Sequence, residues 1–284
     1  MSRAEGWREA GDPHGADRRE HRGGAQRQDP AAHPRDGREA VLARVGALFD
    51  ELAARPGVDE IVPSFSRFHG ELAAARATGD PEAVEVALAR LYCAVHGSGG
   101  AYSSEERLAF DALGGYWCHA GGLEPLHHIA PFVGPRTRLV DYGAGNGFQG
   151  LLIQHLYPHR HTTLVELGGP MIAQGRRLQQ LLGVPGERVS WVHANIVDVP
   201  PRAFDVIYLY RPVRPEGPGR VFYEMLAREL ARVRRPVTIV SVADCLREFL
   251  PPTFRTLHDD GQVVVYANAA GVPARRVGTS PEAA

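Results

Sequence analysis

The sequence predicts an α/β protein in which a helical module precedes a doubly wound, mainly parallel sheet that closes with an antiparallel pair. Three observations predict this fold class. Apolar residues recur at helix spacing through residues 41–133. Short apolar runs then alternate with helical patterns through residues 134–268. The pair Asp260-Gly261 separates the last two of these runs, as in a tight β-hairpin.

The two ends of the chain differ in composition from this central part. The first 40 residues lack Leu, Ile, Val and Phe and are rich in charged residues, Gly and Pro. Such a segment buries too little apolar surface to offset the entropy lost on ordering, so we expect a disordered tail over residues 1–40. We expect a flexible tail over residues 269–284 as well.

Helices are expected throughout residues 41–133, which we interpret as a cap or substrate module. Apolar residues with helical spacing begin at Val41. Asp80 followed by Pro81 is typical of a helix start, because Asp caps the first turn and Pro fits the φ of the first helical residue. Ser103 and Glu106 have the spacing of a capping box, which predicts a further helix.

Residues 134–268 have the order of a βαβ protein, in which right-handed crossovers make successive strands parallel. A helix is expected near residues 219–233, before the last parallel strand. We expect strands over residues 138–142, 162–166, 189–194, 204–210, 237–243, 253–258 and 262–268.

The composition excludes several kinds of chemistry and partner. All 32 basic residues are Arg, so Schiff-base enzymes and phosphate sites that depend on Lys do not fit. The net charge of −1 argues against a surface that coats nucleic acid. The three Cys residues form no CxxC pair, and no apolar run reaches the roughly 18 residues of a membrane helix. We therefore expect a cytoplasmic protein with no membrane or nucleic-acid partner.

The most informative motif is the segment LVDYGAGNGFQG, residues 139–150. A strand runs into Asp141, and Gly143, Gly145 and Gly147 follow at alternate positions before a helix. Gly lets the backbone turn sharply and approach a ligand, and the helix N-terminus offers free N–H groups. The segment also matches the dinucleotide fingerprint, but a carboxylate at Asp141 suits a ligand with positive charge better than a pyrophosphate.

This motif resembles the first motif of class I S-adenosyl-L-methionine (SAM)-dependent methyltransferases, Asp-x-Gly-x-Gly-x-Gly. The resemblance extends over residues 138–268 and implies a Rossmann-like, seven-stranded methyltransferase sheet that binds SAM. Glu166, 19 residues after Gly147, stands where this family binds the ribose hydroxyls. The other cofactor-binding residues that the resemblance implies are Leu167, Met171 and Ile196 beside the adenine, Asn195 at its amine in place of the usual Asp, and Tyr116 over the cofactor.

The predicted catalytic residues are Tyr210, Arg211 and His119. In this family the methyl group points toward the end of the fourth strand, where Tyr210 and Arg211 lie, so we expect both to orient the acceptor. A Tyr at this position is about as often a packed rim residue. His119 is the candidate general base, since a neutral imidazole accepts a proton near neutral pH, and a loop His without chemistry is the alternative.

No metal site is expected. Two groups of possible ligands occur, but neither has paired ligand spacing on one element. They are Cys118, His119, His127 and His128, and His155, His159 and His161.

These features predict a methyltransferase that moves a methyl group from SAM to an unidentified acceptor. A small metabolite is slightly favoured, because a helical cap can enclose one. The first alternative is a protein methyltransferase acting on Lys or a terminus. The second is a nicotinamide-dependent oxidoreductase, which requires the C-terminal hairpin to be absent, and the third is a SAM-binding protein without catalysis. The oligomeric state is not predicted.

Overall fold

A computed structural model describes residues 35–99, 102–116, 122–268 and 270. In this part of the chain the strands are β1 (Arg138–Tyr142), β2 (His161–Glu166), β3 (Val189–His193), β4 (Val206–Tyr210), β5 (Thr238–Val242), β6 (Phe254–Asp259) and β7 (Val263–Asn268). The α-helices are α1 (Arg35–Ala53), α2 (Val58–Ile61), α3 (Phe65–Thr78), α4 (Pro81–His96), α5 (Ser104–Ala112), α6 (Glu124–Ile129), α7 (Phe148–Leu156), α8 (Gly169–Leu181) and α9 (Arg220–Leu230). Short 3-10 helices are η1 (Ala130–Phe132), η2 (Gly186–Arg188), η3 (Ile196–Asp198), η4 (Pro201–Ala203) and η5 (Gly217–Gly219).

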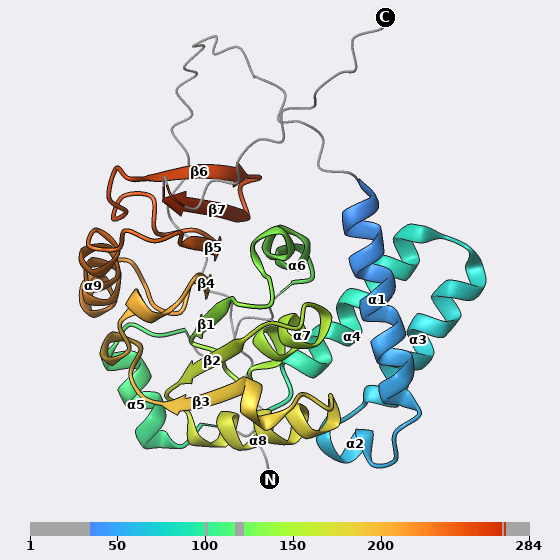
Figure 1. Cartoon of the computed structure of the whole chain (residues 1–284). Helices are drawn as coiled ribbons and strands as arrows, with labels where there is room; N and C mark the ends of the chain where they lie inside the picture. The colour runs from blue at the N-terminus through green and yellow to red at the C-terminus, as the bar shows by residue number, and fades with distance from the viewer. Residues whose placement is uncertain (1–34, 100–101, 117–121, 269, 271–284) are drawn as a thin grey trace, which may run out of the picture. The chain divides into compact units, whose positions relative to one another are not determined.

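The strands form one seven-stranded sheet in the order β3-β2-β1-β4-β5-β7-β6 (Figure 1). Strands β1 to β5 pair in parallel, and β7 lies antiparallel between β5 and β6. The predicted fold class, including the final antiparallel pair, is therefore confirmed. Successive strands are added to one side of β1 and then to the other, so the order reverses between β1 and β4. Doubly wound sheets bind ligands outside the carboxyl ends of the strands at such a reversal.

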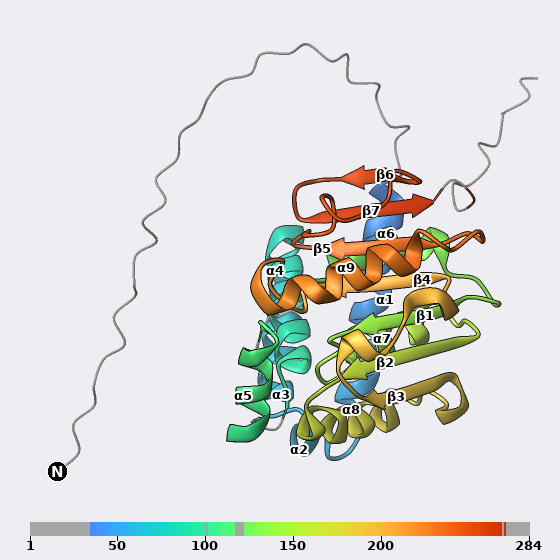
Figure 2. The ribbon, with the colours of Figure 1, turned by 90° about the vertical axis from the view of Figure 1, so that its left-hand side faces the viewer.

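The sheet separates two apolar cores because successive side chains of a strand face opposite sides. On one face, Leu139 and Leu164 pack with buried residues of α1, α4, α6 and α7. On the other face, Val140 and Ile207 pack with buried residues of α9. Figure 2 shows α9 along this second face and α5 beyond the carboxyl ends of the parallel strands. By this alternation Asp141 faces the same side as Leu139, toward α7.

The helical module confirms the predicted helix starts and corrects one boundary. The carboxylate of Asp80 accepts a hydrogen bond from the Glu82 backbone at the start of α4, and Ser103 forms the predicted capping box at the start of α5. Helix α1 begins at Arg35, so the predicted disordered tail is wrong over residues 35–40, where helical hydrogen bonding continues despite the polar composition. Residues 1–34 and most of the predicted C-terminal tail lie outside the described residues.

The division into a cap (41–133) and a core (134–268) stays a prediction. One apolar cluster includes Val45 of α1, Leu91 of α4 and Val265 of β7, so the two predicted parts share a core. None of the helices in the described ranges is both long and apolar enough to cross a membrane.

Candidate active site

The loop after β1 adopts the backbone conformation that its glycines allow. Gly143, Gly145 and Gly147 all have positive φ, of 74°, 58° and 70°, a region that side chains with a Cβ rarely occupy. A Cβ at Gly147 would lie 2.3 Å from the ring of Trp191, whereas a Cβ at Gly145 would have no atom within 4 Å. Gly147 is thus required for packing, and Gly145 borders open space at the carboxyl end of β1.

Asp141 is a buried carboxylate at the end of β1, only 3% exposed. Burial and, less strongly, repulsion from Glu166 raise its pKa to about 7, and a hydrogen bond from the Gly150 backbone opposes this shift. Because desolvation disfavours the charged form, a positively charged ligand beside Asp141 would lower this pKa and be bound more tightly. Asp141 and the open space at Gly145 border the same cavity.

Glu166 at the end of β2 connects the two loops of the site. Its Oε2 accepts a hydrogen bond from the backbone of Gly145 at 2.7 Å, and its Oε1 accepts from Leu167 at 2.9 Å and from Gly168 at 2.7 Å. Burial raises the pKa of Glu166, and these hydrogen bonds oppose that shift. A carboxylate has about four lone-pair positions, and these three hydrogen bonds leave about one, on Oε2, for a hydroxyl of a ligand.

A small apolar cavity adjoins Glu166 on the side of β3. Its lining includes Glu166, Leu167, Asn195 and Ile196, together with Phe110 of α5. Ile196 is buried, and Asn195 caps η3 by accepting a hydrogen bond from the Val197 backbone at 3.2 Å. The small cavity thus brings Glu166 together with Leu167, Asn195 and Ile196, whereas Met171, also implied for the adenine, lines the larger cavity. The resemblance to the family motif did not predict that Asn195 accepts a hydrogen bond from the Val197 backbone.

A larger cavity lies on the other side of the glycine loop, with about 860 Å3 of empty space when its open mouth is included. The predicted residues Tyr116, Met171, Tyr210 and Arg211 all line it. His119 lies outside the described residues. The cavity is roofed in part by Tyr102, just before α5, and by Phe110 within α5.

Two buried polar groups in this cavity were not anticipated from the sequence. The Tyr208 hydroxyl and the Gln149 Nε2 have no hydrogen-bond partner among the described residues, although Tyr208 and Gln149 are each only 2% exposed. An unpaired buried polar group costs about 1–3 kcal/mol, so groups of this kind indicate a bound ligand or water. His96 also lines the cavity, and burial lowers its pKa to about 4, which keeps the ring neutral at neutral pH.

Tyr208 lies on the same sheet face as Asp141 because the two residues pair across β1 and β4, and this register is set by the fold and not by the sequence of β4 alone. Gln149 gave a weak signal, as a polar residue in an otherwise apolar first turn of α7. Nothing in the local sequence indicates that His96 of α4 reaches the same cavity.

Arg211 follows β4 in a strained conformation, with φ of 33°. A non-glycine residue with positive φ costs free energy and is concentrated at functional sites. Its guanidinium lies 5.2 Å from the centre of the Tyr116 ring, and that of Arg214 lies 5.3 Å from the same centre. The Arg211 Nε is buried without a hydrogen-bond partner in the described part of the chain. The end of β4 therefore presents positive charge and an aromatic ring side by side.

Comparisons with known proteins give matches to solved structures alone, since no family model and no curated protein matches the sequence. TrmN from Thermus thermophilus is 20% identical over 51% of this chain and 47% of its own, with a TM-score of 0.40. An RNA methyltransferase from Salinibacter ruber in complex with S-adenosyl-L-homocysteine is 18% identical over 51% of this chain and 86% of its own, with a TM-score of 0.40. The putative methyltransferase yhhF from Escherichia coli is 17% identical over 51% and 83%, with a TM-score of 0.40.

These matches cover about half of this chain and, for TrmN, about half of the matched chain. The matched structures include an RNA methyltransferase and an rRNA methylase, which contradicts the expectation that nucleic acid is excluded as a partner. That expectation rested on net charge, which describes the whole surface and says nothing of a local site. The resemblance inferred from the sequence is confirmed at the level of the fold: the chain has the glycine loop and the seven-stranded sheet of class I SAM-dependent methyltransferases.

Proposed function

We propose that the protein is a SAM-dependent methyltransferase. The observation that carries this proposal is the pair of buried carboxylates, Asp141 and Glu166, on the two sides of a glycine loop that borders open space at Gly145. One carboxylate can balance an ammonium group and the other can accept a hydrogen bond from a ribose hydroxyl. A pyrophosphate in the same place would face two carboxylates, and the antiparallel hairpin that a nicotinamide oxidoreductase should lack is present.

Each part of the cofactor then has a matching surface. The adenine would lie in the small cavity between Leu167 and Ile196, and the ribose at Glu166. The amino-acid part would extend past Asp141 toward Gln149. SAM supplies an activated methyl group on a positively charged sulfur, so the chain's main task is to align the acceptor with it, and orientation of this kind lowers a barrier by roughly 7–11 kcal/mol.

For the acceptor we propose a nucleotide of RNA. The support lies at the end of β4, where Arg211 and Arg214 flank the ring of Tyr116 beside the cavity. Aromatic rings stack with bases, and arginines pair with phosphates, so this combination suits a nucleotide. Tyr210 lines the same wall and would position the base next to the methyl group.

Replacement of Glu166 tests the cofactor site. Glu166→Ala removes the acceptor for a ribose hydroxyl and should weaken binding of S-adenosyl-L-homocysteine by about 1.5–3 kcal/mol, the value of a hydrogen bond to a charged group. Isothermal titration calorimetry measures this change, and circular dichroism checks that the variant is folded. Glu187→Ala, at an exposed position in η2, is the matched control and should bind as the wild type does. Unchanged affinity in folded Glu166→Ala would exclude the ribose role.

The acceptor is identified by transfer of tritiated methyl from SAM to separate pools of total RNA, protein extract and filtered metabolites. The proposal expects label in RNA, at a rate reduced at least about tenfold in Arg211→Gln because one phosphate contact and one ring contact are lost. Arg232→Gln on the exposed surface is the control. Label in protein or metabolites alone contradicts the RNA proposal while leaving methyl transfer intact, and a protein that binds the cofactor but labels no pool contradicts both.

A further inference from the structure

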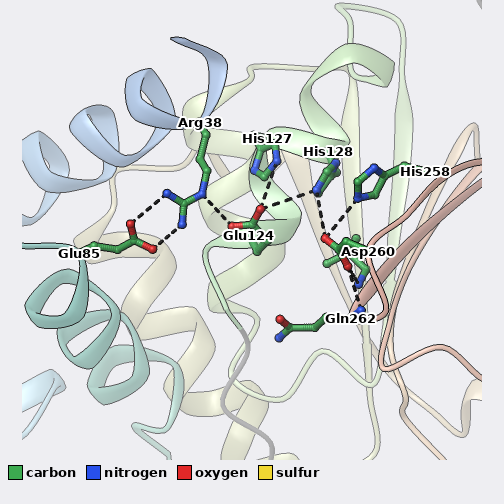
Figure 3. A network of polar contacts seen from close by, with 9 residues as sticks. Arg38, Glu85, Glu124, His127, His128, His258, Asp260 and Gln262 are labelled. Atoms are coloured by element: carbon green, nitrogen blue, oxygen red, sulfur yellow. Dashed lines mark hydrogen bonds and ion pairs between the residues drawn. The ribbon is translucent and has the colours of Figure 1, made fainter. Parts of the chain in front are cut away.

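A second cluster of ionisable side chains lies between α6 and the C-terminal hairpin (Figure 3). His128 comes from α6, while His258 and Asp260 come from β6 and the turn that follows it. The Nε2 atoms of His128 and His258 lie 3.8 Å and 3.2 Å from the same atom, Oδ2 of Asp260. None of the three residues lines the cavity at the glycine loop. The cluster is therefore separate from the candidate active site.

We propose that His128, His258 and Asp260 bind a divalent transition-metal ion, and that Zn2+ fits this ligand set best. Imidazole nitrogen and carboxylate oxygen are ordinary zinc ligands, at about 2.0–2.2 Å from the metal. Tetrahedral geometry at such distances puts neighbouring ligand atoms about 3.3–3.6 Å apart, close to the observed 3.2 Å and 3.8 Å. The three ligand atoms all lie within 4.8 Å of one another, so small side-chain movements bring them around one ion.

The hairpin holds two of the ligands in place. Oδ1 of Asp260 accepts hydrogen bonds from the backbones of Gln262 at 2.8 Å and Val263 at 2.7 Å, which leaves Oδ2 facing the histidines (Figure 3). The β6–β7 pairing has an irregularity between Thr256 and His258. Bulges of this kind redirect a side chain and are common beside functional sites. Metal ligands that are oriented by such outer contacts bind their ion more tightly.

Glu124 supplies a fourth group. Its Oε1 lies 3.8 Å from Nε2 of His128 and 3.4 Å from Nε2 of His127. Its Oε2 accepts a hydrogen bond from Nε of Arg38 at 3.0 Å, and Arg38 also pairs with Glu85. The carboxylate is thus held beside His128, where it can accept a hydrogen bond from a metal-bound water, although it is not grouped with His258 and Asp260 as a direct ligand.

The charge of the cluster suits a divalent cation. The network contains one cation, Arg38, and three carboxylates, those of Glu85, Glu124 and Asp260. The histidines are ligands when neutral, and in that form they add no charge to the cluster. The net charge is then negative by two, and a bound Zn2+ would balance it while joining α6 to the hairpin.

Zinc binding to the untagged, full-length protein tests the proposal. A tag-free chain is needed because histidine tags bind zinc. After treatment with a chelator, we expect one Zn2+ per chain by calorimetry and mass spectrometry, and a higher melting temperature when zinc is added. His128→Gln and His258→Gln should each weaken zinc binding at least about 100-fold, more than the loss of an outer-shell partner. Tetrahedral Co2+ in the same site should give visible absorption that His258→Gln abolishes.

Two control variants distinguish zinc binding at this cluster from zinc binding elsewhere in the chain. Glu85→Gln alters the ion pair with Arg38 but removes none of the ligands, so zinc affinity should fall by less than about tenfold. The N-terminal segment contains His14, His21 and His33, and a variant with Gln at all three should still bind one zinc ion. Zinc binding that persists in His128→Gln and His258→Gln, disappears with the N-terminal histidines, or is absent from the wild type would each overturn the proposal. Circular dichroism confirms that each variant is folded before its binding is compared.

Discussion

Asp141 and Glu166 show how burial and function are linked at single residues. The two carboxylates are 3% and 2% exposed, and burial raises the pKa of each. For Glu166, hydrogen bonds from three backbone N–H groups oppose the rise in pKa. For Asp141, a hydrogen bond from the Gly150 backbone alone opposes it. In the free protein the environment therefore disfavours the ionised form of Asp141. A cationic group of a ligand beside it would stabilise that ionised form.

The pKa of Asp141 predicts a pH dependence of cofactor binding. The free-state pKa is about 7, and an adjacent ammonium group lowers it, so binding releases a proton when the pH is below about 7. Affinity for S-adenosyl-L-homocysteine should thus fall as the pH decreases from 7 to 6, by at most about tenfold per pH unit. Calorimetry across pH 6–8 measures this slope. Asp141→Asn should bind more weakly and lose the slope, and a slope that survives in this variant would contradict the assignment.

At this scale the sequence predicted the residues of the glycine loop and the two carboxylates, because each lies in a contiguous motif whose spacing depends on one strand and one turn. It did not predict Tyr208, Gln149 or His96 in the cavity. These three come from β4, α7 and α4, and their meeting depends on how those elements pack rather than on any local pattern.

Helix α5 differs from the other helices of the module in how it is held. It contains no buried residue, and it begins with the capping box of Ser103 and Glu106. Glu106 also accepts a hydrogen bond from the Gly169 backbone at 2.8 Å, which attaches α5 to the first residue of α8. A segment that makes few buried contacts can open without global unfolding of the protein. The helix that contributes Phe110 to both cavities is thus the one best able to move for ligand entry.

Loss of the cap should loosen α5 locally. Ser103→Ala removes the side-chain acceptor for the Glu106 backbone and should cost about 1 kcal/mol, which corresponds to about fivefold faster amide exchange over residues 104–112. Hydrogen-exchange mass spectrometry measures this, and the melting temperature should hardly change. Asp80→Ala removes the equivalent cap of α4, whose apolar face is buried, and should lower the melting temperature instead. An equal loss of melting temperature in the two variants would show that α5 does not open independently.

Across the whole molecule, the helical module and the sheet are joined by polar as well as apolar contacts. Tyr92 of α4 is fully buried and donates a hydrogen bond to Oε1 of Gln149 in α7. Its ring also packs against Phe148, with ring centres 5.3 Å apart. Since Gln149 lines the cavity, the module supports the site directly, and the two parts should unfold together.

Tyr92→Phe should destabilise the entire protein. It leaves Oε1 of Gln149 without its donor inside the core, at a cost of about 1–3 kcal/mol. Urea unfolding followed by circular dichroism and by tryptophan fluorescence should show one coincident transition that shifts to lower urea. Tyr157→Phe is the matched control, because the buried Tyr157 hydroxyl has no hydrogen-bond partner in the described residues and its removal should cost little. Two separate transitions would show instead that the module and the sheet fold independently.

The sequence by itself determined the order of strands and helices, the capping residues and the glycine loop, because these follow from local periodicity and from the backbone freedom of particular residues. Tertiary structure alone decided which distant side chains meet. His128 and Asp260 face each other only because α6 packs beside the hairpin, and the start of α1 at Arg35 depends on helix propagation into a polar segment that composition could not predict. Contacts of this kind depend on packing geometry, which is a property of the whole fold and not of any segment.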